Sequence, residues 1–193
     1  GSRTSVLITA QDKSQTKKLL AERDLPCPAG VTFGPKEKFN PNLFKNGKYI
    51  IKPALSDASE GITADSVVEM PTEKEKAKKI LQQLQKKFKQ PVIMEQFICA
   101  RELNVSVLER NGKVEVLPIA EIDFSAFQKE LPKIVDYDAK WQKDSFAYNN
   151  TPRKIPADLN KNLSSEIEQL AISAWNALDC RDYVRVDFRL DED

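Results

Sequence analysis

The sequence predicts an α+β protein in which helices pack on antiparallel sheets. Three observations support this: strand-like segments outnumber helices, an Asn111-Gly112 pair joins two strand-like segments as a hairpin turn, and the two longer helical segments each carry an apolar stripe. Hairpin-linked strands are antiparallel, and one-sided helices pack on a sheet face. The 193 residues, 40% hydrophobic, can bury a core as one large domain or two small lobes.

The elements in the first half of the chain are predicted from periodicity and end signals. Residues 12–23 form a helix with surface lysines, which stops at the proline-containing stretch that follows. Residues 48–52 form a strand, and residues 67–69 form another. A helix over 72–89 is expected to begin with a capping box, in which Thr72 is followed three residues later by Glu75.

The second half is predicted to contain four strands and one long helix. The strands are expected at 92–98, 102–108, 114–119 and 183–190, and the helix at 163–178. In the last strand, apolar residues alternate with Arg185, Asp187 and Arg189, so one face is packed and the other is polar. The stretch 125–156 is irregular, and loops of that length in compact domains are often functional.

Composition excludes several classes of function. The net charge of +1, from 30 Lys+Arg and 29 Asp+Glu, argues against nucleic acid and membrane surfaces as partners. No apolar run approaches the roughly 20 residues of a membrane helix, and no signal-peptide pattern opens the chain. The cysteines lack metal spacing and are interpreted as reduced thiols, so we expect a cytoplasmic protein.

The chain contains no histidine, so imidazole acid–base catalysis and Ser-His or Cys-His nucleophiles are excluded. Any chemistry must use Lys, Arg, Asp, Glu and backbone amides. Lys52 ends a strand at a loop of small and polar residues, and Arg185 and Asp187 share the polar face of the last strand. A lysine and an arginine neutralise a polyphosphate, and an aspartate holds magnesium. The loop lacks the Walker spacing, so it is not a P-loop.

Five stretches appear in an order that resembles the ATP-grasp superfamily and, within it, the D-alanine–D-alanine ligase-like proteins. They are IIKPALSDASEGI, VIMEQFICARELNVSVL, LPIAEIDF, VDYDAKW and CRDYVRVDFRLDED. The resemblance covers nearly the whole chain. It implies a two-lobed ATP-grasp fold with a nucleotide cleft between the lobes, 1–100 and 101–193. It also implies an ATP-dependent ligase that converts a small carboxylate into an acyl-phosphate, which an amine then attacks.

The resemblance also implies a nucleotide-binding set. Lys13 and Lys52 match the phosphate-binding lysines, and residues 56–61 match the flap over the β- and γ-phosphates, with the Ser59 amide directed at an oxygen. Glu95 and the backbone of Gln96 to Ile98 match the adenine site, and Glu102 matches the ribose carboxylate.

The implied catalytic and metal-binding residues lie later in the chain. Arg185 matches the arginine that steadies the transferred phosphoryl group, and Lys140 lies where these ligases have a lysine near the γ-phosphate. Asp187 matches the first ligand of the Mg²⁺ that accompanies ATP.

The chain departs from the family pattern in three places. Asp57-Ala58 replaces a Gly-Ser pair in the flap, and Trp141 stands where tyrosine is usual. The sequence ends at Asp193, without the Glu-x-Asn pair of the next strand and without a preceding N-terminal domain. We therefore expect a truncated ATP-grasp region that is inactive alone and has its N-terminal domain as partner.

Simpler interpretations remain open at this point. Lys52 can be a solvated strand end, Glu95 can pair with a neighbouring lysine, and Glu102 can pair with Arg101. Arg185 and Asp187 can form a structural ion pair with each other or with Arg189. At the level of function, a non-catalytic nucleotide-binding or regulatory module is the alternative to a ligase. A nucleic-acid-binding role for the lysine-rich helix is disfavoured by the net charge.

Overall fold

The computed structural model describes residues 1–191, which form two compact units. Unit 1 comprises Gly1–Cys27, Cys99–Ala126 and the described residues from Thr151 onwards, and unit 2 comprises Pro28–Ile98 and Phe127–Asn150. This division differs from the predicted lobes, 1–100 and 101–193. Residues 1–27 belong to the unit that contains most of the second half of the chain, and residues 127–150 belong to the unit that contains most of the first half. The assignment of the lobes themselves stays a prediction.

Unit 2 is built on a four-stranded antiparallel sheet in the order β1-β4-β2-β3. The strands are β1 (Gly30–Phe33), β2 (Gly47–Pro53), β3 (Val67–Met70) and β4 (Val92–Gln96), and the helices are α3 (Lys74–Phe88), α4 (Tyr137–Trp141) and α5 (Phe146–Asn149), with short 3-10 turns at Pro41–Leu43 and Ala64–Ser66. Alternate strand residues, including Ile51 and Met94, pack with Leu81 of α3 in the core. The opposite face of the sheet therefore carries the intervening residues, among them Lys52 and Glu95.

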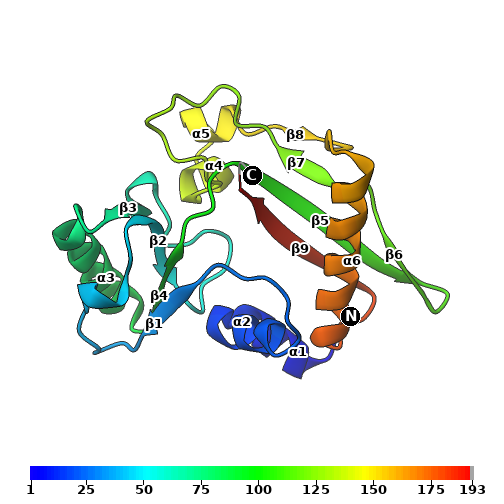
Figure 1. The fold of residues 1–193 in the computed structure, drawn as a ribbon, viewed down its shortest axis with the longest axis horizontal. Helices are drawn as coiled ribbons and strands as arrows, with labels where there is room; N and C mark the ends of the chain where they lie inside the picture. The colour runs from blue at the N-terminus through cyan, green and yellow to red at the C-terminus, as the bar shows by residue number, and fades with distance from the viewer. Residues whose placement is uncertain (192–193) are drawn as a thin grey trace. The chain divides into compact units, whose positions relative to one another are not determined.

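Unit 1 contains a second antiparallel sheet, in which β5 pairs with β6, β7 and β9, and β7 pairs with β8. The strands are β5 (Arg101–Arg110), β6 (Lys113–Val116), β7 (Ala120–Ile122), β8 (Arg153–Lys154) and β9 (Tyr183–Leu190), and the helices are α1 (Thr4–Gln11), α2 (Lys13–Ala21) and α6 (Lys161–Ala177). The long helix α6 lies over this sheet in Figure 1. Its Ile167 and Trp175 pack with Leu103, Val105 and Val107 of β5.

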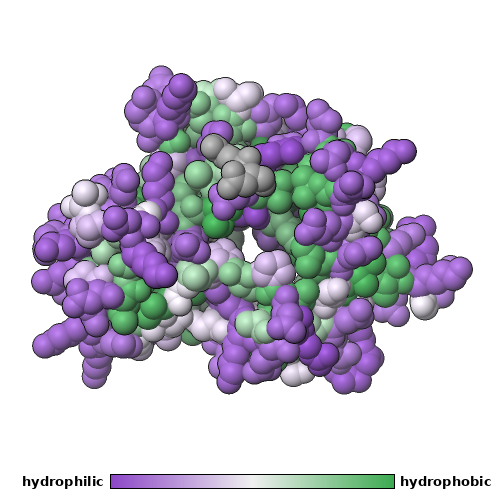
Figure 2. Space-filling view, viewed as in Figure 1, coloured by the Kyte–Doolittle hydropathy of each residue, from purple (hydrophilic) through white to green (hydrophobic). Residues whose placement is uncertain are grey.

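The structure confirms the predicted α+β class and most predicted elements. Asn111 and Gly112 both have positive φ, of 52° and 73°, and join β5 to β6 as the predicted hairpin. Figure 2 shows mainly hydrophilic side chains on the part of unit 2 where α3 lies, which fits a solvated lysine-rich face. Within residues 1–191 no helix has the length and hydropathy needed to cross a bilayer.

The predicted capping box at Thr72 is wrong. Helix α3 begins at Lys74, and Glu73 occupies its N-cap position without a side-chain cap. The Thr72 hydroxyl donates to the Glu69 carbonyl at 3.1 Å, and the Glu69 amide donates to the Glu73 carboxylate at 2.8 Å. That amide bond is the main reason why the pKa of Glu73 is lowered. The polar groups before α3 therefore bond to the end of β3 instead of capping the helix.

Candidate functional site

Lys52 and Glu95 form an ion pair on the side of the unit 2 sheet that faces away from α3. Ile50 lies opposite Glu95 and Lys52 opposite Ile93, so the two charged residues are diagonal neighbours on β2 and β4. Lys52 Nζ lies 2.6 Å from Glu95 Oε1, and the side chains are 20% and 8% exposed. Charges this poorly solvated interact more strongly than surface pairs, so each holds the other in place.

Gly30 allows β1 to lie close to Glu95, and the sequence did not identify it as part of the site. It lies directly opposite Glu95 in the β1–β4 pair. A Cβ atom at position 30 would lie 2.6 Å from Glu95 Cβ and 2.8 Å from the Met94 carbonyl oxygen. A glycine at the start of a β-branched strand is the only signal in the sequence, since glycine in a strand often marks a close approach.

The predicted adenine segment begins at the end of β4. The Gln96 amide donates to the Ala29 carbonyl at 2.8 Å, and the Phe97 amide donates to the Lys48 carbonyl at 2.9 Å. Those two donors are therefore already used within unit 2. A backbone contact with adenine from this segment would therefore have to use groups other than these two amides.

The predicted flap, residues 56–61, is hydrogen-bonded at its base and at its tip. At the base, Gln90 accepts from the Leu55 amide at 2.6 Å and donates to the Ser56 hydroxyl at 3.0 Å. At the tip, the Ser59 hydroxyl donates to the Val135 carbonyl at 2.7 Å, and the Trp141 indole N–H donates to the Ala58 carbonyl at 3.1 Å. The tip is thereby tied to residues 135–141 of the same unit.

Lys140 and Trp141 lie on α4, the short helix that follows Val135. Asp136 caps this helix by accepting from the Ala139 amide at 3.0 Å. Burial of Asp136 raises the pKa of its carboxyl. Lys140 is half-buried and Trp141 is 56% exposed. The structure thus connects the predicted γ-phosphate lysine to the flap through one short element.

Unit 1 presents a polar row along β5 and β9, in which Glu102 lies opposite Arg189 and Asn104 lies opposite Asp187. Arg185 binds both oxygens of Asp187, with Nε–Oδ1 at 2.7 Å and Nη2–Oδ2 at 2.9 Å. Asn104 donates to Asp187 Oδ1 at 3.0 Å. The bond to Asp187 is the main cause of the raised pKa of Arg185.

Asp187, the predicted magnesium ligand, does not make a metal site by itself. Both of its oxygens accept from the Arg185 guanidinium, whose charge opposes a nearby cation. In the part of the chain that the structure describes, no group of three Asp, Glu, Cys or His side chains is placed to hold a metal ion. Magnesium usually retains waters and takes one or two carboxylates together with substrate phosphates, so this donor set fits it only in part.

Glu102 pairs with Arg189 and not with Arg101. Arg189 Nη2 lies 2.6 Å from Glu102 Oε2, and the side chains are 23% and 14% exposed. Arg101 instead donates two hydrogen bonds, of 2.7 and 2.6 Å, to the Glu121 carboxylate. The difference arises because neighbouring residues on a strand point to opposite faces.

Lys13, the other predicted phosphate lysine, is the first residue of α2. Asp12 caps that helix by accepting from the Ser14 and Gln15 amides. Unit 1 therefore brings Glu102, Arg185 and Asp187 onto one sheet face, while Lys13 lies on a separate helix. Unit 2 brings Lys52 and Glu95 together and connects Ser59 with the α4 segment.

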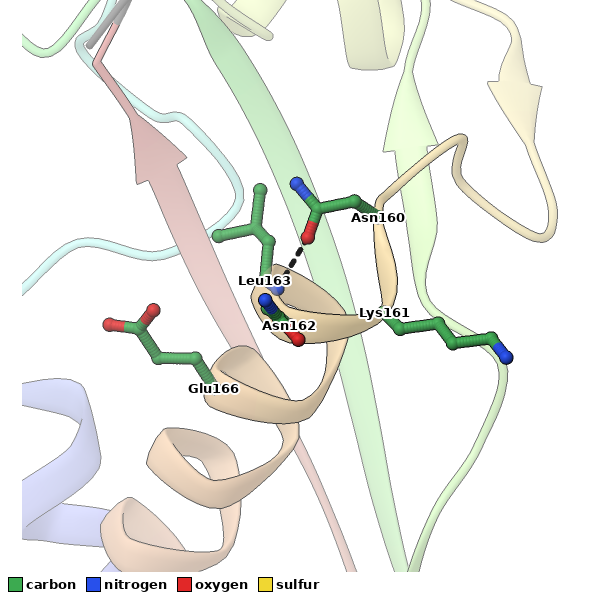
Figure 3. Close-up of a pocket in the computed structure, with 5 residues that line it drawn as sticks. All are labelled: Asn160, Lys161, Asn162, Leu163 and Glu166. Atoms are coloured by element: carbon green, nitrogen blue, oxygen red, sulfur yellow. Dashed lines mark hydrogen bonds between the residues drawn. The ribbon is translucent and has the colours of Figure 1, made fainter.

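Two hollows in unit 1 differ in their relation to these residues. One, of about 480 Å³, is lined by Arg185 and mostly apolar side chains: Ser106, Val107, Leu108, Leu117, Tyr183 and Val184. The other, of about 590 Å³, lies at the start of α6, where Asn160 accepts from the Leu163 amide at 2.9 Å (Figure 3). The second contains none of the predicted site residues.

Known proteins resemble this chain over almost its whole length. The family model "D-ala D-ala ligase C-terminus" matches residues 36–193. A D-alanine–D-alanine ligase of Rhodococcus jostii is 33% identical over 194 residues, covering 94% of this chain and 47% of that protein. One from Agrobacterium fabrum is 30% identical over 185 residues, covering 95% and 53%.

Solved structures share the fold. A D-alanyl-alanine synthetase A from Vibrio cholerae superposes with a TM-score of 0.71 at 18% identity, covering all of this chain and 55% of that one. A D-Ala:D-Ser ligase from Enterococcus faecalis gives 0.70 at 24% identity, covering 99% and 51%. The chain spans about half the length of the curated relatives it matches.

Proposed function

The chain belongs to the family of D-alanine–D-alanine ligase C-terminal regions, and we propose that it is the ATP-binding part of an ATP-dependent ligase that joins a carboxylate to an amine. The observation that supports this most directly is the poorly solvated Lys52–Glu95 pair, whose lysine precedes the 56–61 loop in the sequence. A lysine held at a fixed position suits a polyphosphate.

In this proposal, unit 2 supplies the adenine and phosphate contacts. Lys52, oriented by Glu95, neutralises phosphate charge, and the loop brings the Ser59 amide to a phosphate oxygen. Because Lys52 is only 20% exposed, its interaction with an anion is screened less than that of a surface lysine. Glu95 and the segment from Gln96 to Ile98 contact the adenine edge.

Unit 1 supplies the ribose contact and the charge needed for transfer. Glu102 accepts hydrogen bonds from ribose hydroxyls, and Lys13 contacts phosphate. Arg185 steadies the transferred phosphoryl group after it has released the Asp187 carboxylate and bound phosphate oxygens. A planar guanidinium binds either partner with two hydrogen bonds.

The proposed reaction has two steps. A carboxylate oxygen of the first substrate attacks the γ-phosphorus, the bond to ADP breaks, and an acyl-phosphate forms. The amine nitrogen of the second substrate then attacks the acyl carbon, phosphate leaves, and the nitrogen loses a proton. Arg185 and Lys140 offset the negative charge on the moving phosphoryl group. Since Asp187 alone does not make a magnesium site, we assign no step to the metal.

A non-catalytic nucleotide-binding module is the second candidate. The bidentate Arg185–Asp187 pair favours it, because the two groups that a phosphoryl transfer needs neutralise each other. Measuring ADP release by the complete product of the gene, with a small carboxylate and an amine, separates the candidates. A ligase releases ADP over many turnovers only when both substrates are present, whereas a binding module retains ATP unchanged.

Titration calorimetry with ATP tests the binding proposal. Lys52→Ala is expected to weaken binding about 10- to 100-fold, since bonds to charged groups contribute about 1.5–3 kcal/mol. Lys79→Ala is the matched control: this lysine is exposed on α3, and a solvated lysine contributes little. Thermal unfolding checks that both variants fold. Equal losses of affinity in the two variants would contradict the role of Lys52.

A further inference from the structure

Arg189 forms a contact with a predicted site residue that the sequence did not anticipate. It lies directly opposite Glu102 across β5 and β9, with Nη2 2.6 Å from Oε2. The pair lies on the same sheet face as Asp187 and Arg185. The side chains of Arg189 and Glu102 are only 23% and 14% exposed, so water competes weakly for this contact.

We propose that Arg189 is a positioning residue for Glu102, which it holds in the orientation that accepts hydrogen bonds from the ribose hydroxyls of a nucleotide. The inference rests on the proposed function, because it takes Glu102 as the ribose carboxylate. A glutamate side chain has three rotatable bonds, and a neighbouring guanidinium restricts them by fixing the carboxylate end. Sites that recognise a ligand need such support for the residues that touch it.

The charges of the pair support this role. The two side chains carry opposite charges, and both are mostly buried. Each charge therefore depends on the other in a place where neither is well hydrated. A carboxylate has about four acceptor positions, so a contact with Arg189 is compatible with further bonds from hydroxyls.

The chain offers a matched control on the same strand. Arg101 binds Glu121 with two short bonds, but on the face of β5 that does not carry Glu102. Arg189→Met and Arg101→Met each remove one guanidinium from an Arg–Glu pair of unit 1. Only the first removes the partner of a residue that is proposed to touch the nucleotide.

The experiment compares the dissociation constants of ATP and 2′,3′-dideoxy-ATP for each protein. The original chain is expected to prefer ATP by about tenfold or more, because the analogue lacks the hydroxyls. Arg101→Met is expected to keep that ratio. Arg189→Met is expected to lose most of the preference for ATP, so that the two dissociation constants differ by less than about threefold. The loss is expected to come from weaker binding of ATP, with little change for the analogue. Arg189→Lys, which keeps the charge but not the planar fork, is expected to give an intermediate ratio.

A ratio that is unchanged in Arg189→Met overturns the inference, and so does tighter ATP binding, which would show that Arg189 competes with the ribose. If thermal unfolding shows that Arg189→Met is not folded, the ratio of the two dissociation constants in Arg189→Lys tests the inference instead. A chain that binds ATP without preferring it to the analogue overturns this inference alone. A chain that binds neither nucleotide overturns the proposed function itself.

Discussion

Gly30 faces Glu95 across β1 and β4 so closely that a methyl group at position 30 would lie 2.6 Å from Glu95 Cβ. Backbone atoms of Glu95 and Met94 complete the contact, at 2.8 Å each. No flexible side-chain end can move aside to make room. The position of the Glu95 carboxylate, and through it that of Lys52, therefore depends on a residue without a side chain.

Gly30→Ala is accordingly expected to destabilise the chain by about 1–3 kcal/mol, the usual cost of overpacking, and to weaken ATP binding by displacing Glu95. Denaturant unfolding and calorimetry measure the two effects. Gly34→Ala is the control, because a Cβ there would meet its nearest neighbours at 3.7 and 3.9 Å, an ordinary contact. If Gly30→Ala binds ATP as well as Gly34→Ala does, the close contact between Gly30 and Glu95 is not needed for binding.

Trp141→Phe is expected to loosen the tip of the 56–61 loop. The change removes the indole N–H that donates to the Ala58 carbonyl, a neutral bond that contributes about 0.5–1.5 kcal/mol. Amide hydrogen exchange in residues 56–61 should become faster, while the unfolding midpoint changes little because Trp141 is 56% exposed. Tyr183→Phe, in unit 1, is a control expected to leave loop exchange unchanged. Unaltered exchange in Trp141→Phe would show that the indole bond does not restrain the loop.

Asp187→Asn tests the proposed metal contact. If Asp187 helps to hold magnesium with ATP, the original chain binds ATP more tightly when Mg²⁺ is present, and the variant loses that gain. Without Mg²⁺ the variant is expected to bind ATP more tightly than the original chain, because Arg185 no longer faces a carboxylate. Calorimetry with and without Mg²⁺ measures both. The same magnesium effect in both proteins would remove Asp187 from the proposed site.

The sequence by itself determined the class of the fold and most of its elements, because those depend on local periodicity. The alternation of 183–190 gave the bounds of β9 directly, and the apolar spacing of 163–178 located α6 to within two residues at its start. The capping box was wrong because Glu69, at the end of β3, competes for the polar groups of Thr72 and Glu73. The identity of the candidate residues also came from the sequence, through the resemblance of its five stretches to a known family.

Only the tertiary structure decided which charges meet. Glu102 has Arg101 beside it in sequence, yet the antiparallel register of β5 and β9 places Arg189 opposite it and turns Arg101 to the other face. The same dependence on register pairs Lys52 with Glu95 and requires a glycine at position 30. Strand pairing joins residues that are distant along the chain, so which residues meet depends on the register of whole strands and not on any short stretch of sequence.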